Sequence, residues 1–136
     1  MCEAHRMSSI QVADQTFVAV PGETVADTLG APNRWRVWWP DLTLEVTDDR
    51  ADKGIRWRVG GALTGTMEVW LEPMPVLHGV ILHYFLHAEP ASAATVDLQA
   101  ENRRRRAAGK AMAFEVKRKL EAGRAAGERP AHADLR

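Results

Sequence analysis

The stretch that decides the fold is Asn33–Asp41, which reads Asn-Arg-Trp-Arg-Val-Trp-Trp-Pro-Asp. It holds three of the five tryptophans of the chain, and Trp35, Trp38 and Trp39 fall at positions i, i+3 and i+4. This spacing predicts a short helix with all three rings on one face. Pro40 ends the helix, because a proline disfavours helical geometry at the residue before it. The rings either plug the core or line a pocket for an apolar ligand.

The hydrophobic pattern predicts one strand before this helix and four strands after it. Ser9–Val20 is rich in β-branched and aromatic residues, and a second short helix over Glu23–Leu29 separates it from the tryptophan helix. Beyond Pro40, apolar and polar residues alternate with a period of two, which is typical of half-buried strands. These strands cover Leu42–Thr47, Ile55–Val59, Leu63–Glu72 and Val80–His87.

A long helical pattern closes the chain, from about Thr95 to Gly123. Its expected buried stripe consists of Ala108, Met112, Ala113, Val116 and Leu120. Since an antiparallel sheet must cover its apolar face, and only this element is long enough, the sequence predicts an α+β fold. We expect a curved antiparallel sheet of about five strands wrapped on the C-terminal helix, with two short helices after the first strand. The domain is expected at 8–124, between flexible tails at 1–7 and 125–136.

Composition bounds the class of protein. The chain has 136 residues, which fits one domain, and its formal net charge is zero. Cys2 is the only cysteine, so an internal disulfide and a cysteine-based zinc site are excluded. We found neither the apolar core of a signal peptide nor an apolar run near the roughly 18 residues of a membrane span. We therefore expect a cytoplasmic protein without integral membrane association.

Four segments carry a resemblance to a known family. They are Phe17-Val18-Ala19-Val20-Pro21 leading into Glu23-Thr24-Val25, Arg34-Trp35 to Trp39-Pro40, Gly65 to Trp70-Leu71-Glu72-Pro73, and the closing helix. Over about Ser9–Gly123 the chain resembles the START-like helix-grip (SRPBCC) superfamily, and it looks most like small actinobacterial members of the polyketide cyclase/dehydrase-like group. The usual family has seven strands, so fewer strands here would shrink the cavity. The resemblance implies binding of hydrophobic small molecules such as lipids, sterols or polyketides, and it does not imply catalysis.

The expected ligand is therefore a hydrophobic small molecule held between the sheet and the C-terminal helix. The residues expected to line its site are Trp35, Trp38, Trp39, Trp57, His83, Tyr84 and Met112. Two other classes stay open: a polyketide cyclase- or dehydratase-like enzyme, and a protein-interaction module. No catalytic residue is assigned and no cofactor is expected, and the sequence leaves a homodimer open.

Glu68 is the candidate base for the enzyme alternative. If its face of the strand lined the cavity, burial would raise the pKa of the carboxyl and suit it to proton abstraction. If that face met solvent, Glu68 would be a cross-strand partner of Arg56 or Arg58. The second interpretation is favoured, because these arginines alternate with the apolar Ile55-Trp57-Val59 face.

The remaining polar patterns point to no metal and no nucleic acid. His83 and His87 share a strand face, but a metal site needs further ligands, so a hydrogen bond at the sheet face is favoured over a metal or proton-shuttle role. Arg103–Arg106 spreads around a helix, so at least one arginine must turn toward the sheet, with Glu101 as a partner of Arg105. Interleaved aromatic residues that would stack on bases are absent from this run.

Overall fold

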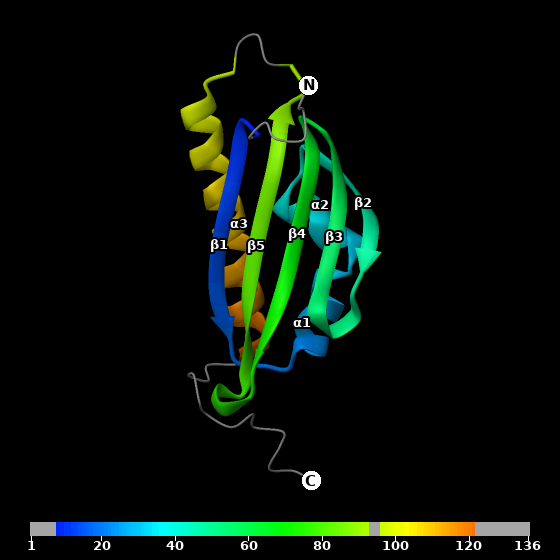
Figure 1. Ribbon diagram of the computed structural model, residues 1–136, viewed down its shortest axis with the longest axis vertical. Coiled ribbons are helices and arrows are strands. Elements are labelled where there is room, and N and C mark those ends of the chain that lie inside the picture. Colours follow the sequence, from blue (N-terminus) through cyan, green and yellow to red (C-terminus); the bar gives the residue numbers. More distant parts are fainter. Residues whose placement is uncertain (1–7, 93–95, 122–136) are drawn as a thin grey trace, which may run out of the picture.

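The computed structural model describes residues 8–92 and 96–121 and shows one antiparallel sheet covered on one face by helices (Figure 1). The strand order is β1-β5-β4-β3-β2. The strands are β1 (Ile10–Val18), β2 (Leu42–Asp49), β3 (Gly54–Gly61), β4 (Leu63–Met74) and β5 (Gly79–Pro90). The helices are α1 (Gly22–Leu29), α2 (Pro32–Trp38) and α3 (Leu98–Glu121). Single 3-10 turns, η2 (Ala51–Lys53) and η3 (Pro75–Leu77), lie in two of the strand connections.

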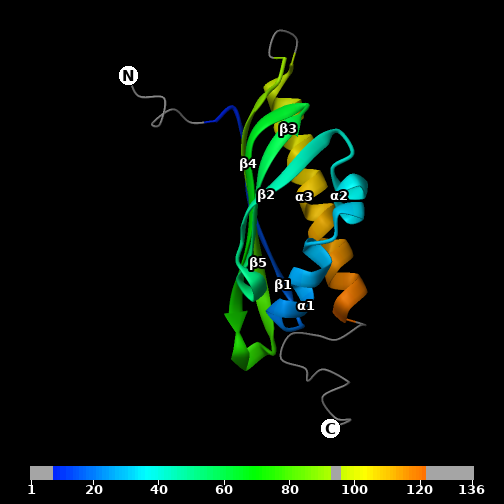
Figure 2. The same cartoon turned by 90° about the vertical axis from the view of Figure 1, so that its right-hand side faces the viewer.

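The sheet curves around the long helix. Figure 2 shows α3 running along one face of the sheet, with α1 and α2 on the same side. This arrangement confirms the predicted α+β helix-grip fold, with five strands and two short helices after β1. The tails expected at 1–7 and 125–136 lie outside the described residues.

Strand register aligns the apolar side chains in a row across the sheet. Val12 is paired with Leu86, Leu86 with Met67, and Met67 with Trp57. Each of these four side chains is almost completely buried. Because successive residues of a strand point to opposite faces, the row faces the helices and its neighbours along each strand face outward. The inner face is therefore the core, as the alternation of the sequence predicted.

The buried stripe of α3 is also confirmed. Met112, Ala113 and Val116 are at most 2% exposed, and Ala108 and Leu120 pack against the core as partly buried residues. Although α3 is long, it is strongly charged, and no helix of the described residues is long and apolar enough to cross a membrane.

The start of α3 differs slightly from the prediction. The helix begins at Leu98, and the Asp97 carboxylate accepts hydrogen bonds from the backbone N–H groups of Gln99 and Ala100. Because the first N–H groups of a helix lack partners within it, an aspartate at this position fixes the helix start.

Strand β2 departs from the predicted half-buried strand at one residue. Val46 was expected to face inward with Leu42 and Leu44, but it is 41% exposed. The pairing with β3 shifts register between Val46 and Asp48, as at a β-bulge. Since β2 is an edge strand, this irregularity turns its second half away from the core.

Candidate functional site

Helix α2 and the residue that follows it carry three tryptophans into the space between the sheet and α3. Pro32 occupies the first turn, where a missing N–H has no cost, and the helix ends at Trp38, two residues before Pro40. Trp38 and Trp39 are 8% and 1% exposed, whereas Trp35 is half-buried. Trp39 already lies beyond the helix as its C-cap residue, so its ring is placed by non-helical backbone.

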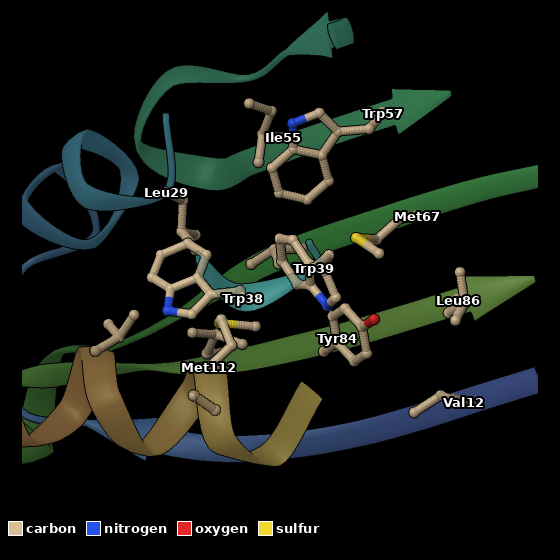
Figure 3. Close-up of a cluster of buried hydrophobic side chains, with 14 of the residues drawn as sticks. Val12, Leu29, Trp38, Trp39, Ile55, Trp57, Met67, Tyr84, Leu86 and Met112 are labelled. Carbon is tan, nitrogen blue, oxygen red and sulfur yellow. The ribbon is translucent and has the colours of Figure 1, made fainter. Parts of the chain in front are cut away.

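Five rings form what we call the aromatic cluster: Trp35, Trp38, Trp39, Trp57 and Tyr84. Trp39 lies at its centre (Figure 3). Its ring stacks on Tyr84 with centroids 6.1 Å apart, and it meets Trp57 and Trp38 edge-on at 5.8 and 5.5 Å. Trp35 meets Trp57 edge-on at 5.7 Å. Such edge-on and stacked pairs stabilise a cluster beyond the burial of its surface.

The predicted lining residues are therefore brought together, with one exception. Met112 of α3 is fully buried against the cluster (Figure 3), and the five rings are in mutual contact. His83 lies on the outer face of the sheet, because it precedes the inward-facing Tyr84 on β5. Its ring stacks on Trp70, and its Nε2 lies 2.9 Å from Glu72 Oε1. His83 is thus separated by the sheet from the other six residues.

Four polar atoms of the aromatic cluster are buried without a hydrogen-bond partner among the described residues. They are the indole Nε1 atoms of Trp38, Trp39 and Trp57 and the Tyr84 hydroxyl. The Trp39 N–H lies close enough to lower the pKa of the Tyr84 hydroxyl, but the two groups do not reach hydrogen-bond geometry. An unpaired buried donor costs about 1–3 kcal/mol. The interior therefore contains several hydrogen-bond donors without a partner in the part of the chain that the structure describes.

Burial controls the chemistry of Tyr84. It raises the pKa of the hydroxyl well above its ordinary value, while the charge of Arg105 and the Trp39 N–H act in the opposite direction. The hydroxyl therefore stays protonated at neutral pH and can donate a hydrogen bond. The ring packs against α3 at Gly109, where an added Cβ would lie 2.5 Å from Tyr84 Cε2.

Arg105 ties α3 to the residue that follows the tryptophans. Its guanidinium donates to both carboxylate oxygens of Asp41, at 3.0 and 2.6 Å, and to Glu101 at 2.8 Å. The hydrogen bond from Arg105 holds the pKa of Asp41 below its usual value. Burial raises the pKa of Glu101, but the bonds from Arg105 and Arg104 outweigh it and leave that pKa lowered. The expected inward-turning arginine and the Glu101 partnership are confirmed.

Polar contacts also hold α2 itself. The Trp35 indole donates to the Leu29 carbonyl at 2.6 Å, and Arg34 forms an ion pair with Glu115 of α3. The four-residue spacing of Glu115 and Lys119 on the helix would predict an ion pair between them, but the structure shows Arg34 as the partner of Glu115. Helix α2 is therefore fastened to α1 and α3 by polar groups, although its rings are in the core.

The outer face of the sheet carries the other polar candidates. Glu68 accepts from Arg56 at 3.0 Å and from Arg50 at 2.6 Å, which confirms the solvent-facing interpretation. Arg58 pairs instead with Glu45 of β2 at 2.5 Å. His83 and His87 belong to no group of three or more metal-ligating side chains within the part of the chain that the structure describes.

Several hollows of the described residues open to the surface. Five of them have volumes of about 160 to 480 Å³, and no member of the aromatic cluster lines any of the five. The rings thus occupy the space that the fold leaves between the sheet and α3, and a ligand would have to displace them.

Sequence reasoning missed two residues of this region. Gly109 admits the Tyr84 ring, and Asp41 holds Arg105. A glycine in the middle of a helical pattern was a usable signal, because glycine there costs about 1 kcal/mol relative to alanine. Asp41 gave no such signal, since its partner lies 64 residues away.

Comparison with known proteins supports the fold. No family model and no curated protein matches the chain. Among solved structures, the Aha1 dimer from Colwellia psychrerythraea has a TM-score of 0.61 at 14% identity, covering 85% of this chain and 99% of that one. The Polyketide_cyc-like protein Cgl2372 from Corynebacterium glutamicum has a TM-score of 0.55 at 16% identity, covering 85% and 93%.

A third similar structure is the di-domain ARO/CYC StfQ from the steffimycin biosynthetic pathway. Its TM-score is 0.54 at 14% identity, and the match covers 82% of this chain and 50% of that chain. At these identities the comparisons show a shared fold. The helix-grip fold that the sequence resemblance implied is thereby confirmed.

Proposed function

We propose that the protein binds an apolar small molecule that carries a hydrogen-bond acceptor, between the sheet and α3. The observation that supports this proposal is the set of four unpaired donors in the aromatic cluster. Pockets for apolar ligands are lined by aromatic side chains with a few polar groups that fix orientation. A carbonyl or ether oxygen beside Trp39 and Tyr84 would accept the hydrogen bonds that the free protein leaves unmade.

Helix α2 is the element that would move. Its rings pack in the interior, and three polar contacts tie the helix and the turn after it to neighbouring helices: Trp35 to Leu29, Arg34 to Glu115, and Asp41 to Arg105. A ligand would enter by displacing rings of α2, and its apolar surface would replace the contacts that the rings lose. The bound ligand is thus a lipid- or polyketide-like molecule, as the resemblance implied.

The enzyme alternative has less support. The one base that sequence analysis offered, Glu68, is bound to two arginines on the outer face. The homodimer and the cytoplasmic location stay predictions, and the molar mass in solution tests the first of them.

Tryptophan fluorescence tests the proposal. Titration with fatty acids, sterols and aromatic polyketides should shift the emission saturably, because four of the five tryptophans belong to the cluster. Trp57→Phe, which removes one unpaired N–H and part of a buried ring, should weaken binding. Trp70→Phe is the matched control, since Trp70 is 40% exposed on the outer face.

Two results would contradict the proposal. One is the absence of a saturable change with every ligand class in a folded protein. The other is a change that Trp70→Phe abolishes and Trp57→Phe leaves intact, because the ligand would then lie on the outer face.

A further inference from the structure

Charge is unevenly distributed over the molecule. The chain has a formal net charge of zero, yet α3 carries eight lysines and arginines against three glutamates. Glu101 and Glu121 are buried, and the half-buried Glu115 is held in its ion pair with Arg34. The acidic groups of α3 are thus withdrawn from the surface, and its fully exposed charged side chains are all cationic.

These cations lie on the outward side of α3 together with one aromatic side chain. We call this surface the basic face: Arg103, Arg106, Lys110, Phe114, Lys117 and Arg118. The intervals between Arg103, Lys110, Phe114 and Lys117 are seven, four and three residues, which places them along one stripe of the helix. Arg103, Arg106 and Arg118 have no carboxylate partner within residues 8–92 and 96–121. They are exposed and available to an external anion.

An apolar side chain lies within the basic face. Phe114 is 50% exposed, and the Lys110 ammonium lies 5.2 Å from the centre of its ring. Beside it, a shallow hollow of about 480 Å³ between β1 and α3 is lined by Arg103, Arg106 and Lys110, with Asp14 as its one carboxylate. Asp14 is bound to Lys110 at 2.8 Å, so neither arginine pairs with the one carboxylate of this hollow.

We propose that the basic face of α3 docks the protein on an anionic lipid bilayer. A cluster of basic residues on a helix is attracted to anionic headgroups, and an exposed aromatic ring lies favourably at the membrane–water interface. The long stems of lysine and arginine bury along apolar surface while their charges reach the phosphates. Phe114 within the basic stripe matches both requirements, and the arginine-lined hollow fits a phosphate headgroup. This proposal does not depend on ligand binding inside the sheet.

A bilayer fits this surface better than a nucleic acid does. Phe114 lies within the basic face, and a nucleic-acid phosphate backbone offers no apolar surface to this ring, whereas the acyl boundary of a bilayer does. Single strands are held on several aromatic platforms, whereas Phe114 is the one exposed aromatic residue that α3 offers in the described residues.

Co-sedimentation with vesicles tests the docking surface. The protein should sediment with phosphatidylglycerol vesicles and stay in solution with phosphatidylcholine vesicles, and added salt should release it. The double variant Arg103→Gln, Arg106→Gln should bind the anionic vesicles about 25-fold more weakly, since each basic residue at a membrane surface contributes about fivefold. Phe114→Ala should also weaken binding.

The matched control is Arg56→Gln with Arg58→Gln, which removes the same charge from the outer face of the sheet. It should retain binding, and circular dichroism should show every variant folded. Three results would overturn the proposal: no sedimentation with anionic vesicles, equal loss in the two double variants, or binding to a DNA duplex that outcompetes the vesicles.

Discussion

The substitution Tyr84→Phe isolates the property on which the proposed site depends. It deletes a hydroxyl that is buried and unpaired, and it keeps the ring that stacks on Trp39 and packs at Gly109. Removing an unpaired buried polar group recovers its desolvation cost of about 1–3 kcal/mol. We therefore expect the variant to be more stable by about 1 kcal/mol, which corresponds to a rise of roughly 4 °C in Tm.

Urea and thermal unfolding followed by circular dichroism measure this change. Thr16→Val is the matched control, because the Thr16 hydroxyl is buried but lies 3.2 Å from Lys110 Nζ, so its loss should destabilise the protein. The same Tyr84 variant should bind an acceptor-bearing ligand more weakly, although it is more stable. A fall of about 1 kcal/mol or more in the free energy of unfolding of Tyr84→Phe would match the loss of one hydrogen bond. It would mean that the hydroxyl is already paired in the free protein. The argument that Tyr84 offers an unpaired donor to a ligand would then be refuted.

Three further predictions follow from the core and from its ion pairs. Val116→Asp should destabilise the fold by about 4 kcal/mol or more, because an unpaired charge would replace a fully buried side chain. Chemical unfolding measures this loss, and a Tm within about 2 °C of the wild type would contradict the prediction. Gly109→Ala should lower Tm despite the better helix propensity of alanine, since the new Cβ would meet the Tyr84 ring; an unchanged or raised Tm would show that the ring gives way. Arg105 lowers the pKa of Asp41 in the folded state, so the ion pair should add to the free energy of unfolding in full above the unfolded pKa of about 4. This stabilisation should be lost as the pH falls through the folded pKa of Asp41. Asp41→Asn should flatten this part of the curve of stability against pH, and a curve identical to that of the wild type would contradict the prediction.

The single tyrosine offers one more measurement. Burial raises the pKa of Tyr84, so the folded protein should show no phenolate absorbance at the pH near 10 where a free tyrosine ionises. The unfolded chain would lose its proton first, so stability should fall as pH rises above about 10. Phenolate absorbance in a folded protein near pH 10 would show that water reaches the hydroxyl.

Faces of strands were predictable because side-chain alternation is a local property. Arg56 and Trp57 differ by one position, and the pleat alone sends one to solvent and the other to the core. The same rule decided between the two interpretations of Glu68. It also separates His83 from Tyr84, so grouping His83 with the interior aromatic residues conflicted with the alternation.

Partners in space were less predictable, because sequence spacing does not encode them. The Glu115–Lys119 interval suits an ion pair along a helix, yet Arg34 of α2 reaches Glu115. Asp41 and Arg105 come into contact only because α2 places the turn that follows it beside α3. The sequence spacing placed Trp39 on a helical face, but the helix ends one residue earlier, and the non-helical backbone at Trp39 directs its ring to Tyr84. Each of these contacts depends on how elements pack, which composition and periodicity leave open.

The composition of the interior argues against a simple plug of aromatic side chains. Phenylalanine or leucine side chains could fill the space between a five-stranded sheet and its helix without burying a side-chain N–H group. Natural cores leave few buried polar groups unpaired. Here three indole nitrogens and one hydroxyl are left unpaired within one cluster, next to the short helix whose ties to its neighbours are polar. Their combined desolvation cost, at about 1–3 kcal/mol each, weakens the closed state that the rings fill. A ligand that supplied acceptors would recover part of that cost on entry, so the same donors that destabilise the filled core would favour its exchange for a bound molecule.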